Sequence, residues 1–214
     1  MLNALSLPLL GFLLGVRHAL DPDHVVAMST IASRSPTLRR AVLVGAIWGM
    51  GHTLTIVAVG GAIIGLKVTI SPRLGLAMEF AVALMLVALG AYNLFLARRG
   101  ELTEPSTARP FLVGMVHGLA GSAAVALLVL AAVDSALWAM GYLLLFGAGT
   151  VGGMAVATTA IALPAAMAAA RVAAARRWLT AASGALSLLF GLALAYTLGG
   201  PGGLFSDAPR WTPH

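Results

Sequence analysis

The 214-residue sequence contains no cysteine and few charged side chains. Only 9% of its residues are charged and 7% are aromatic, whereas 60% are hydrophobic. An ordinary soluble domain has about 45–50% apolar residues and about 25% charged ones. The absence of cysteine excludes disulfides, thiol relays and thiolate metal ligands. The composition therefore predicts an integral membrane protein.

Acidic residues are also scarce, at 7 against 13 basic ones, which gives a net charge of +6. The basic residues form short clusters between apolar runs, so they indicate membrane topology rather than binding to nucleic acid. Short cytoplasmic loops carry the excess of Lys and Arg. Residues 34–40, 98–109 and 171–177 are then inside, and both termini are predicted to lie outside a cell (inner) membrane that the chain crosses several times.

Long apolar runs are abundant. About twenty such residues cross a bilayer, and six stretches predict an all-α protein with six transmembrane helices. These stretches are Ala4–Ser33, Ala41–Leu66, Leu74–Leu96, Pro110–Val133, Leu137–Ala169 and Trp178–Leu198. The first and fifth are too long for one straight helix and contain Pro22, Gly152-Gly153 and Pro164, so each is predicted to be kinked or to overhang the membrane. Residues 199–214 predict a flexible C-terminal tail.

Two segments recur within the chain. Gly15–Leu20 resembles Gly114–Leu119 at a shift of ninety-nine residues, and Trp48–Thr53 resembles Phe146–Val151 at nearly the same shift. Each unit, residues 1–100 and 101–198, holds three predicted spans, so the two must have opposite orientations. Inverted three-helix repeats are a recurring transporter architecture, with the substrate site near the midplane where helices are broken.

A polar cluster interrupts the first span at Arg17-His18-Ala-Leu-Asp21-Pro22-Asp23-His24. Pro22 lacks an N–H and pushes the preceding residue away from helical angles, so the helix is predicted to break there. Freed backbone and ionisable groups at membrane depth normally face a protein interior or a cavity. Imidazole and carboxylate suit divalent first-row transition ions. The cluster therefore predicts a metal site.

Other polar residues lie in the predicted spans. His52, between Gly51 and Thr53, is expected to complete a metal set of His18, Asp21, Asp23, His24 and His52. An alternative is that these groups only tie helices together through hydrogen bonds, with Arg17 paired to Asp21 or Glu79. The further candidates for a pathway or a supporting role are Arg17, His117, Ser122, Thr53, Thr150 and Glu79.

These motifs resemble those of a known family. His18-Ala-Leu-Asp-Pro-Asp23-His24 is similar to the His-x4-Asp-His signature of the nickel/cobalt transporter (NiCoT) family, and Trp-Gly-Met-Gly-His52-Thr is similar to its second motif. The stretches His117-Gly-Leu-Ala-Gly-Ser122 and Phe146-Gly-Ala-Gly-Thr150 resemble the UreH-like branch, whose members accompany nickel enzymes such as urease. The resemblance implies uptake of Ni²⁺ or Co²⁺, with His18, Asp23, His24 and His52 as metal-site or selectivity residues.

The predicted function is thus transmembrane transport of Ni²⁺ or Co²⁺ as a substrate, by a protein that is not an enzyme and has no resident cofactor. The expected partners are membrane lipid, a transition-metal ion and, indirectly, a nickel enzyme such as urease. Two alternatives stay open. Export would use the same ligands, and an integral-membrane metalloenzyme would hold a metal with an open water position.

Overall fold

The computed structural model describes residues 6–35, 37–66, 70–101, 106–132, 135–169 and 173–211, without the side chains of residues 6–8, 121–132, 136, 164–165, 168–169 and 173. These residues form seven helices and no strand. The helices are α1 (Ser6–His18), α2 (Pro22–Ala32), α3 (Leu38–Leu66), α4 (Pro72–Arg99), α5 (Ala108–Ala132), α6 (Ala136–Ala169) and α7 (Ala173–Gly199).

The first predicted span is divided into α1 and α2, which confirms the break near Pro22. Residues 4 and 5 of that span, and residue 133 of the fourth, lie outside the described part of the chain. The fifth predicted span is one continuous helix, α6, in which Gly152, Gly153 and Pro164 cause no interruption. Its candidate membrane span ends at Leu163, one residue before Pro164.

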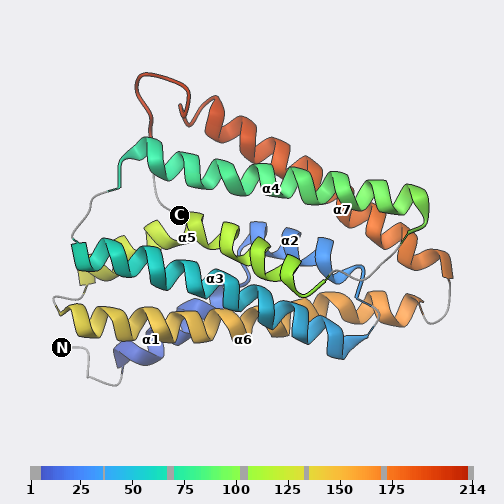
Figure 1. Cartoon of the computed structure of the whole chain (residues 1–214), viewed down its shortest axis with the longest axis horizontal. Coiled ribbons are helices and arrows are strands. Elements are labelled where there is room, and N and C mark those ends of the chain that lie inside the picture. Colours follow the sequence, from blue (N-terminus) through green and yellow to red (C-terminus); the bar gives the residue numbers. More distant parts are fainter. Residues whose placement is uncertain are drawn as a thin grey trace.

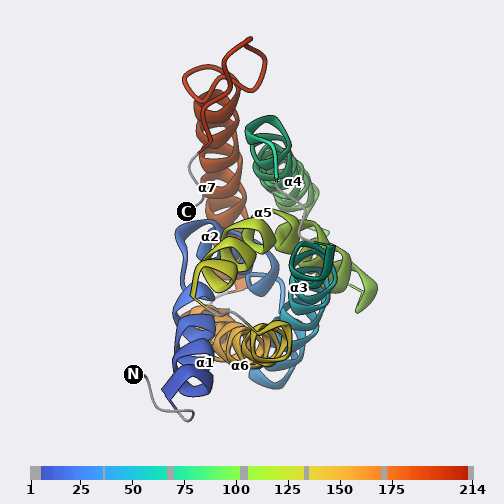
Figure 2. The same ribbon diagram turned by 90° about the vertical axis from the view of Figure 1, so that its left-hand side faces the viewer.

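The helices run roughly parallel to one long axis (Figure 1). Seen end-on in Figure 2, α4 and α7 form one layer, α1, α3 and α6 form the opposite one, and α2 and α5 lie between them. Within this arrangement α3 packs against both α5 and α6, α1 lies along α6, and α4 pairs with α7. Asn93 of α4 ties α2 to this pair by donating to the Thr30 carbonyl at 2.7 Å.

Polar groups are buried while large apolar side chains cover the outside. His52, Asn93 and Thr150 are fully buried, whereas Leu137 and Val156 are largely exposed. Four helices in the described part are long and apolar enough to cross a membrane: α3, α4, Leu137–Leu163 of α6 and Ala174–Gly199 of α7. An apolar exterior around a polar interior is what a bilayer requires. The chain is an all-α, multi-pass membrane protein.

The described part of the predicted tail, residues 200–211, folds back from α7 onto the start of α4 (Figure 1). Leu204 is buried beside Leu76 and Leu198, and the Trp211 side chain packs on Gly75. Arg73 donates to the Ser206 carbonyl at 2.8 Å. These contacts attach the segment to α4, while its predicted flexibility stays a prediction.

Candidate metal centre

The break between α1 and α2 places four polar side chains on a short piece of backbone: His18, Asp21, Asp23 and His24. Asp21 caps α2 with extended backbone angles, φ −60° and ψ 146°, and Pro22 begins the helix. This turn separates His18, at the last position of α1, from Asp23 and His24 in the first turn of α2. Because the chain is not helical between them, Asp23 reaches the same cluster as His18 and His24.

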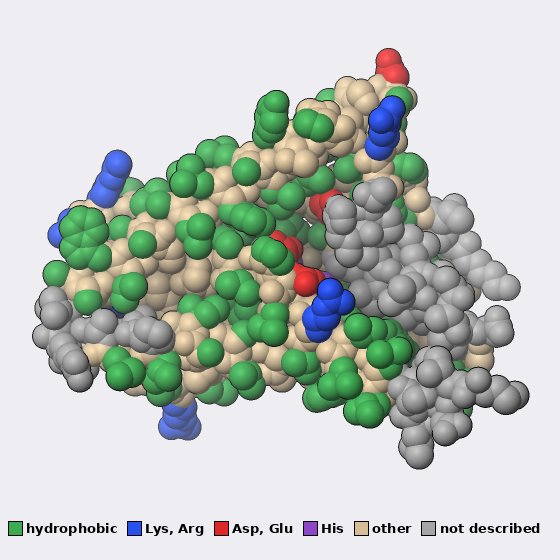
Figure 3. All heavy atoms as spheres, turned by 180° about the vertical axis from the view of Figure 1, so that it is seen from behind, with side chains coloured by type: hydrophobic (Ala, Val, Ile, Leu, Met, Phe, Trp, Pro, Cys, Tyr) green, Lys and Arg blue, Asp and Glu red, His purple; other side chains and the backbone are tan. Residues whose placement is uncertain are grey.

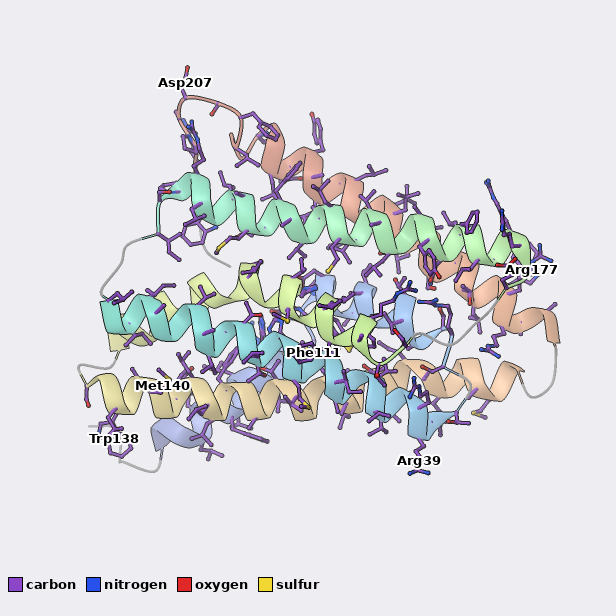
Figure 4. The ribbon with its side chains drawn as sticks, viewed as in Figure 1. Arg39, Phe111, Trp138, Met140, Arg177 and Asp207 are labelled. Carbon is purple, nitrogen blue, oxygen red and sulfur yellow. The ribbon has the colours of Figure 1, made fainter. Side chains whose placement is uncertain are left out.

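Two further histidines reach the cluster from α3 and α5, where glycine allows the helices to approach closely. A Cβ atom at Gly118 would lie 2.6 Å from the His52 carbonyl oxygen. Gly114 of α5 packs on Trp48, and Gly51 of α3 packs on the Phe111 backbone, whose side chain is labelled in Figure 4. The small residues therefore bring His52 and His117 together at the centre of the bundle.

The four imidazole rings form one compact group. His24 lies at its middle, with its ring centroid 4.2 Å from that of His117, 4.6 Å from His18 and 5.0 Å from His52. His24, His52 and His117 are 2%, 0% and 1% exposed. Their isolation from water makes unpaired ring nitrogens costly, unless a ligand such as a metal ion binds them.

The carboxylates hold the imidazoles by their N–H groups. Asp21 Oδ2 lies 2.8 Å from His18 Nδ1, and the two oxygens of Asp23 lie 3.0 Å from His24 Nδ1 and 2.8 Å from His117 Nε2. An ionised carboxylate only accepts hydrogen bonds, so each of these nitrogens donates and the other ring nitrogen keeps its lone pair. Histidine ligands of metals are commonly held in this way.

The lone pairs that result have few partners. His24 Nε2 and His117 Nδ1 are buried and make no hydrogen bond with the described residues. His18 Nε2 lies 3.1 Å from His52 Nε2. Two sets of residues bring potential ligand atoms within 4.8 Å of one another: His18, His24 and His52 form the first, and Asp23, His24 and His117 form the second. His24 belongs to both sets, so the two sets are alternative groups of ligands around one shared histidine.

A cavity of 320 Å³ adjoins the histidines. Its polar lining consists of His18, Asp21, Asp23, His24, Glu79 and His117, and its apolar lining comes from Pro22, Val82, Ala120, Phe190 and Leu194. Figure 3 shows acidic side chains and a small area of histidine at mid-length on the rear face of the molecule, beside a basic side chain. The part of the cavity next to the histidines is thus rich in carboxylates.

The remaining candidates have different surroundings. Arg17 is exposed and makes no ion pair with the described residues, so Arg17 does not tie helices together through Asp21 or Glu79. Thr53 of α3 donates to the Gly147 carbonyl of α6, and Thr150 of α6 donates to the Gly15 carbonyl of α1. These two threonines join helices, and their role in a pathway stays a prediction. The side chain of Ser122 lies outside the described part.

Sequence reasoning missed two aromatic neighbours of the centre. The Trp48 ring centroid lies 5.9 Å from that of His24 and 5.6 Å from that of His117, and Phe146 lies 5.3 Å from His18. Trp48 precedes His52 by one helical turn, so the spacing already places both residues on one helix face. Phe146 is the repeat equivalent of Trp48, and its contact with His18 depends on the packing of α6 on α1.

One curated protein resembles the chain over nearly its whole length. The urease accessory protein UreH of Bacillus sp. (strain TB-90) is 36% identical over 220 aligned residues, which cover 95% of this chain and 96% of the relative. No protein-family model and no solved structure matches the chain.

Proposed function

Because the chain belongs to the UreH-like branch of the nickel/cobalt transporter family, we propose that it carries Ni²⁺ or Co²⁺ across the cell membrane. The relative is named as an accessory protein of urease. Urease is a nickel enzyme, so it needs a supply of nickel. The ion is then cargo rather than a resident cofactor. The accessory role of the relative favours transport over the metalloenzyme alternative.

The observation that carries this proposal is the convergence of four histidines and two carboxylates from three parts of an apolar bundle. Nitrogen and oxygen donors of this kind suit Ni²⁺ and Co²⁺. In the proposed mechanism, the ion loses water as it enters the centre and is held by His18, Asp21, Asp23, His24 and His52, with His117 beside them. Acid weakens binding, because protons compete for the imidazoles and carboxylates.

Contacts between the two halves support the proposed six-span architecture with inverted repeats. In Figure 1 the span made of α1 and α2 runs opposite to α5, α3 opposite to α6, and α4 opposite to α7. Contacts between the halves also occur in matched pairs, in which equivalent residues exchange roles at shifts of 98 or 99 positions. The matched pairs are Gly15–Phe146 with Gly114–Trp48, Phe12–Gly149 with Phe111–Gly51, and Gly49–Val151 with Gly147–Thr53.

Such a relation lets the halves rock against each other around a central site, which is a common route to alternating access. Uptake is the proposed direction, because the third loop, residues 98–109, carries no histidine to collect ions for export. Both termini then lie outside the cell (inner) membrane. Export remains the alternative direction for the same site.

Uptake by the purified protein in liposomes tests the proposal. The parent protein is expected to accumulate Ni²⁺ or Co²⁺ inside the vesicles, with and without a pH gradient. His18→Ala and His24→Ala variants are expected to lose uptake, because each removes an imidazole from the centre. Zn²⁺ and Mn²⁺ measured in parallel give the ion preference.

Glu101→Gln is a suitable control, since Glu101 pairs with Arg99 at the protein surface and does not line the cavity. Its uptake should equal that of the parent. Equal accumulation by the two histidine variants and the parent would disprove the site, whereas bound metal without transmembrane flux would favour the metalloenzyme.

A further inference from the structure

The cavity extends beyond the histidines to Glu79, a residue of α4 whose carboxylate is held by the C-terminal segment. We infer that this cavity is a vestibule in which Glu79 binds a hydrated divalent cation before the ion reaches the histidines, and that Trp211 positions the Glu79 carboxylate. The inference rests on the proposed transport function and adds an access site to it.

Depth along the bundle places Glu79 on the outer side of the centre. α1 begins, α4 begins and α7 ends at the same end of the molecule (Figure 1). At a rise of about 1.5 Å per residue, Glu79 lies about 10 Å into α4, whereas His18 lies about 18 Å into α1. Because this end carries the termini, it is the proposed outer end. An ion from outside meets Glu79 first.

The lining of the cavity suits a cation that keeps its water. Asp21, Asp23 and Glu79 contribute carboxylates, and no Lys or Arg is among the described lining residues. Six waters occupy about 180 Å³ of liquid volume, so the 320 Å³ cavity can hold a hydrated ion. At the inner end His24, almost fully buried, has an unpartnered ring nitrogen that can replace one of these waters.

Trp211 fixes the carboxylate by a direct hydrogen bond. Its indole N–H donates to Glu79 Oε1 at 2.8 Å. The indole ring lies on Gly75, one helical turn before Glu79, where any side chain would collide with it. The C-terminal segment that carries Trp211 is itself attached to α4 through Arg73 and Ser206. Gly75 and Trp211 therefore act together to hold Glu79 at the cavity.

Steady-state uptake of Ni²⁺ in proteoliposomes tests the vestibule. Glu79→Gln removes the charge but keeps an oxygen that accepts from Trp211. We expect it to raise the KM for uptake about 5- to 10-fold by lowering the local ion concentration, without a matching change in the Kd of the histidine centre measured by calorimetry. Trp211→Phe keeps a ring but loses the donor, and is expected to raise KM about threefold.

Two further measurements separate attraction of the ion from a structural role. Glu79→Asp retains the charge and should keep a KM closer to that of the parent than Glu79→Gln does. At high ionic strength the KM values of the parent and Glu79→Gln should converge, because salt screens the carboxylate. Asp207→Asn changes an exposed acid at the tip of the C-terminal segment (Figure 4) and should leave KM unchanged.

An unchanged KM in Glu79→Gln, with normal uptake by the parent, would overturn the vestibule. A Kd for the histidine centre that rises in step with KM would also overturn it, since Glu79 would then belong to that centre. If Glu79→Gln is missing from the membrane, Glu79→Asp and Trp211→Phe decide by the same KM criterion. Absence of uptake by the parent itself would instead refute the proposed transport function.

Discussion

At the scale of single residues, His24 has the most central position among the potential metal ligands. It is the one histidine shared by the two potential ligand sets, and its Nδ1 is held by Asp23 while its Nε2 is buried without a partner. A buried nitrogen of this kind is stabilised by a cation but not by its apolar surroundings. The side chain is therefore arranged for binding rather than for packing.

Removal of His24 should accordingly affect metal binding more than removal of His52. His24→Ala breaks both sets, and we expect a loss of Ni²⁺ affinity of more than about 100-fold; His52→Ala leaves Asp23, His24 and His117 in place and should cost about tenfold. Titration calorimetry on the purified protein measures both. Equal losses in the two variants would show that only the set with His52 binds the ion.

At the scale of helices, two structural features bring the site residues together. One is the break in the first span, where Asp21 is extended and Pro22 restarts the helix, so that side chains of α1 and α2 meet. The other is close approach at glycine, which brings α3 into contact with α5 and α6, and α1 into contact with α6. Small residues serve this purpose in membrane helices, where apolar surfaces alone give little association.

The adjacent glycines of α6 allow a matched test of close packing. A Cβ atom at Gly153 would lie 2.8 Å from Ala19 Cβ, whereas one at Gly152 would meet nothing within 4 Å. We expect Gly153→Ala to destabilise the protein by about 1–3 kcal/mol and to weaken Ni²⁺ binding, because Ala19 follows His18. Gly152→Ala should be neutral or stabilising by up to about 1 kcal/mol.

Thermal unfolding followed by circular dichroism in detergent, together with Ni²⁺ titration, distinguishes the two variants. Equal melting temperatures for Gly152→Ala and Gly153→Ala would contradict the packing of α1 on α6.

At the scale of the whole molecule, the positions of the charged residues and of the exposed apolar side chains indicate one orientation of the bundle in the membrane. Arg39 and Arg177 lie toward one end of the bundle, and Asp207 lies toward the other, as Figure 4 shows. Between these ends the exposed side chains are mainly apolar, and the buried His24 and His117 line the cavity. The excess of basic residues belongs on the cytoplasmic side.

The absence of native cysteine makes this orientation straightforward to measure. In right-side-out membrane vesicles, a membrane-impermeant maleimide should label Asp207→Cys directly. Arg98→Cys should react only after the vesicles are opened, since residue 98 lies in a predicted cytoplasmic loop. The reverse labelling pattern would place the termini inside and would turn the vestibule at Glu79 toward the cytoplasm.

Much of the fold was predictable from the sequence because a bilayer imposes simple local rules. Apolar length located the helices, and Pro22 located the break between α1 and α2. Four of the five predicted metal residues, with Asp23 among them, lie within the two potential ligand sets. These features depend on neighbours in the chain, so local patterns are enough to reveal them.

The sequence by itself thus determined the membrane class, the broken first helix and the donor types of the site. Only the tertiary structure decided which nitrogens face the centre, that His117 shares Asp23 with His24, and that Trp211 reaches across 132 positions to Glu79. The physical reason is that donor types and helix breaks follow from local chemistry. Distances between side chains far apart in the chain follow only from how the helices pack.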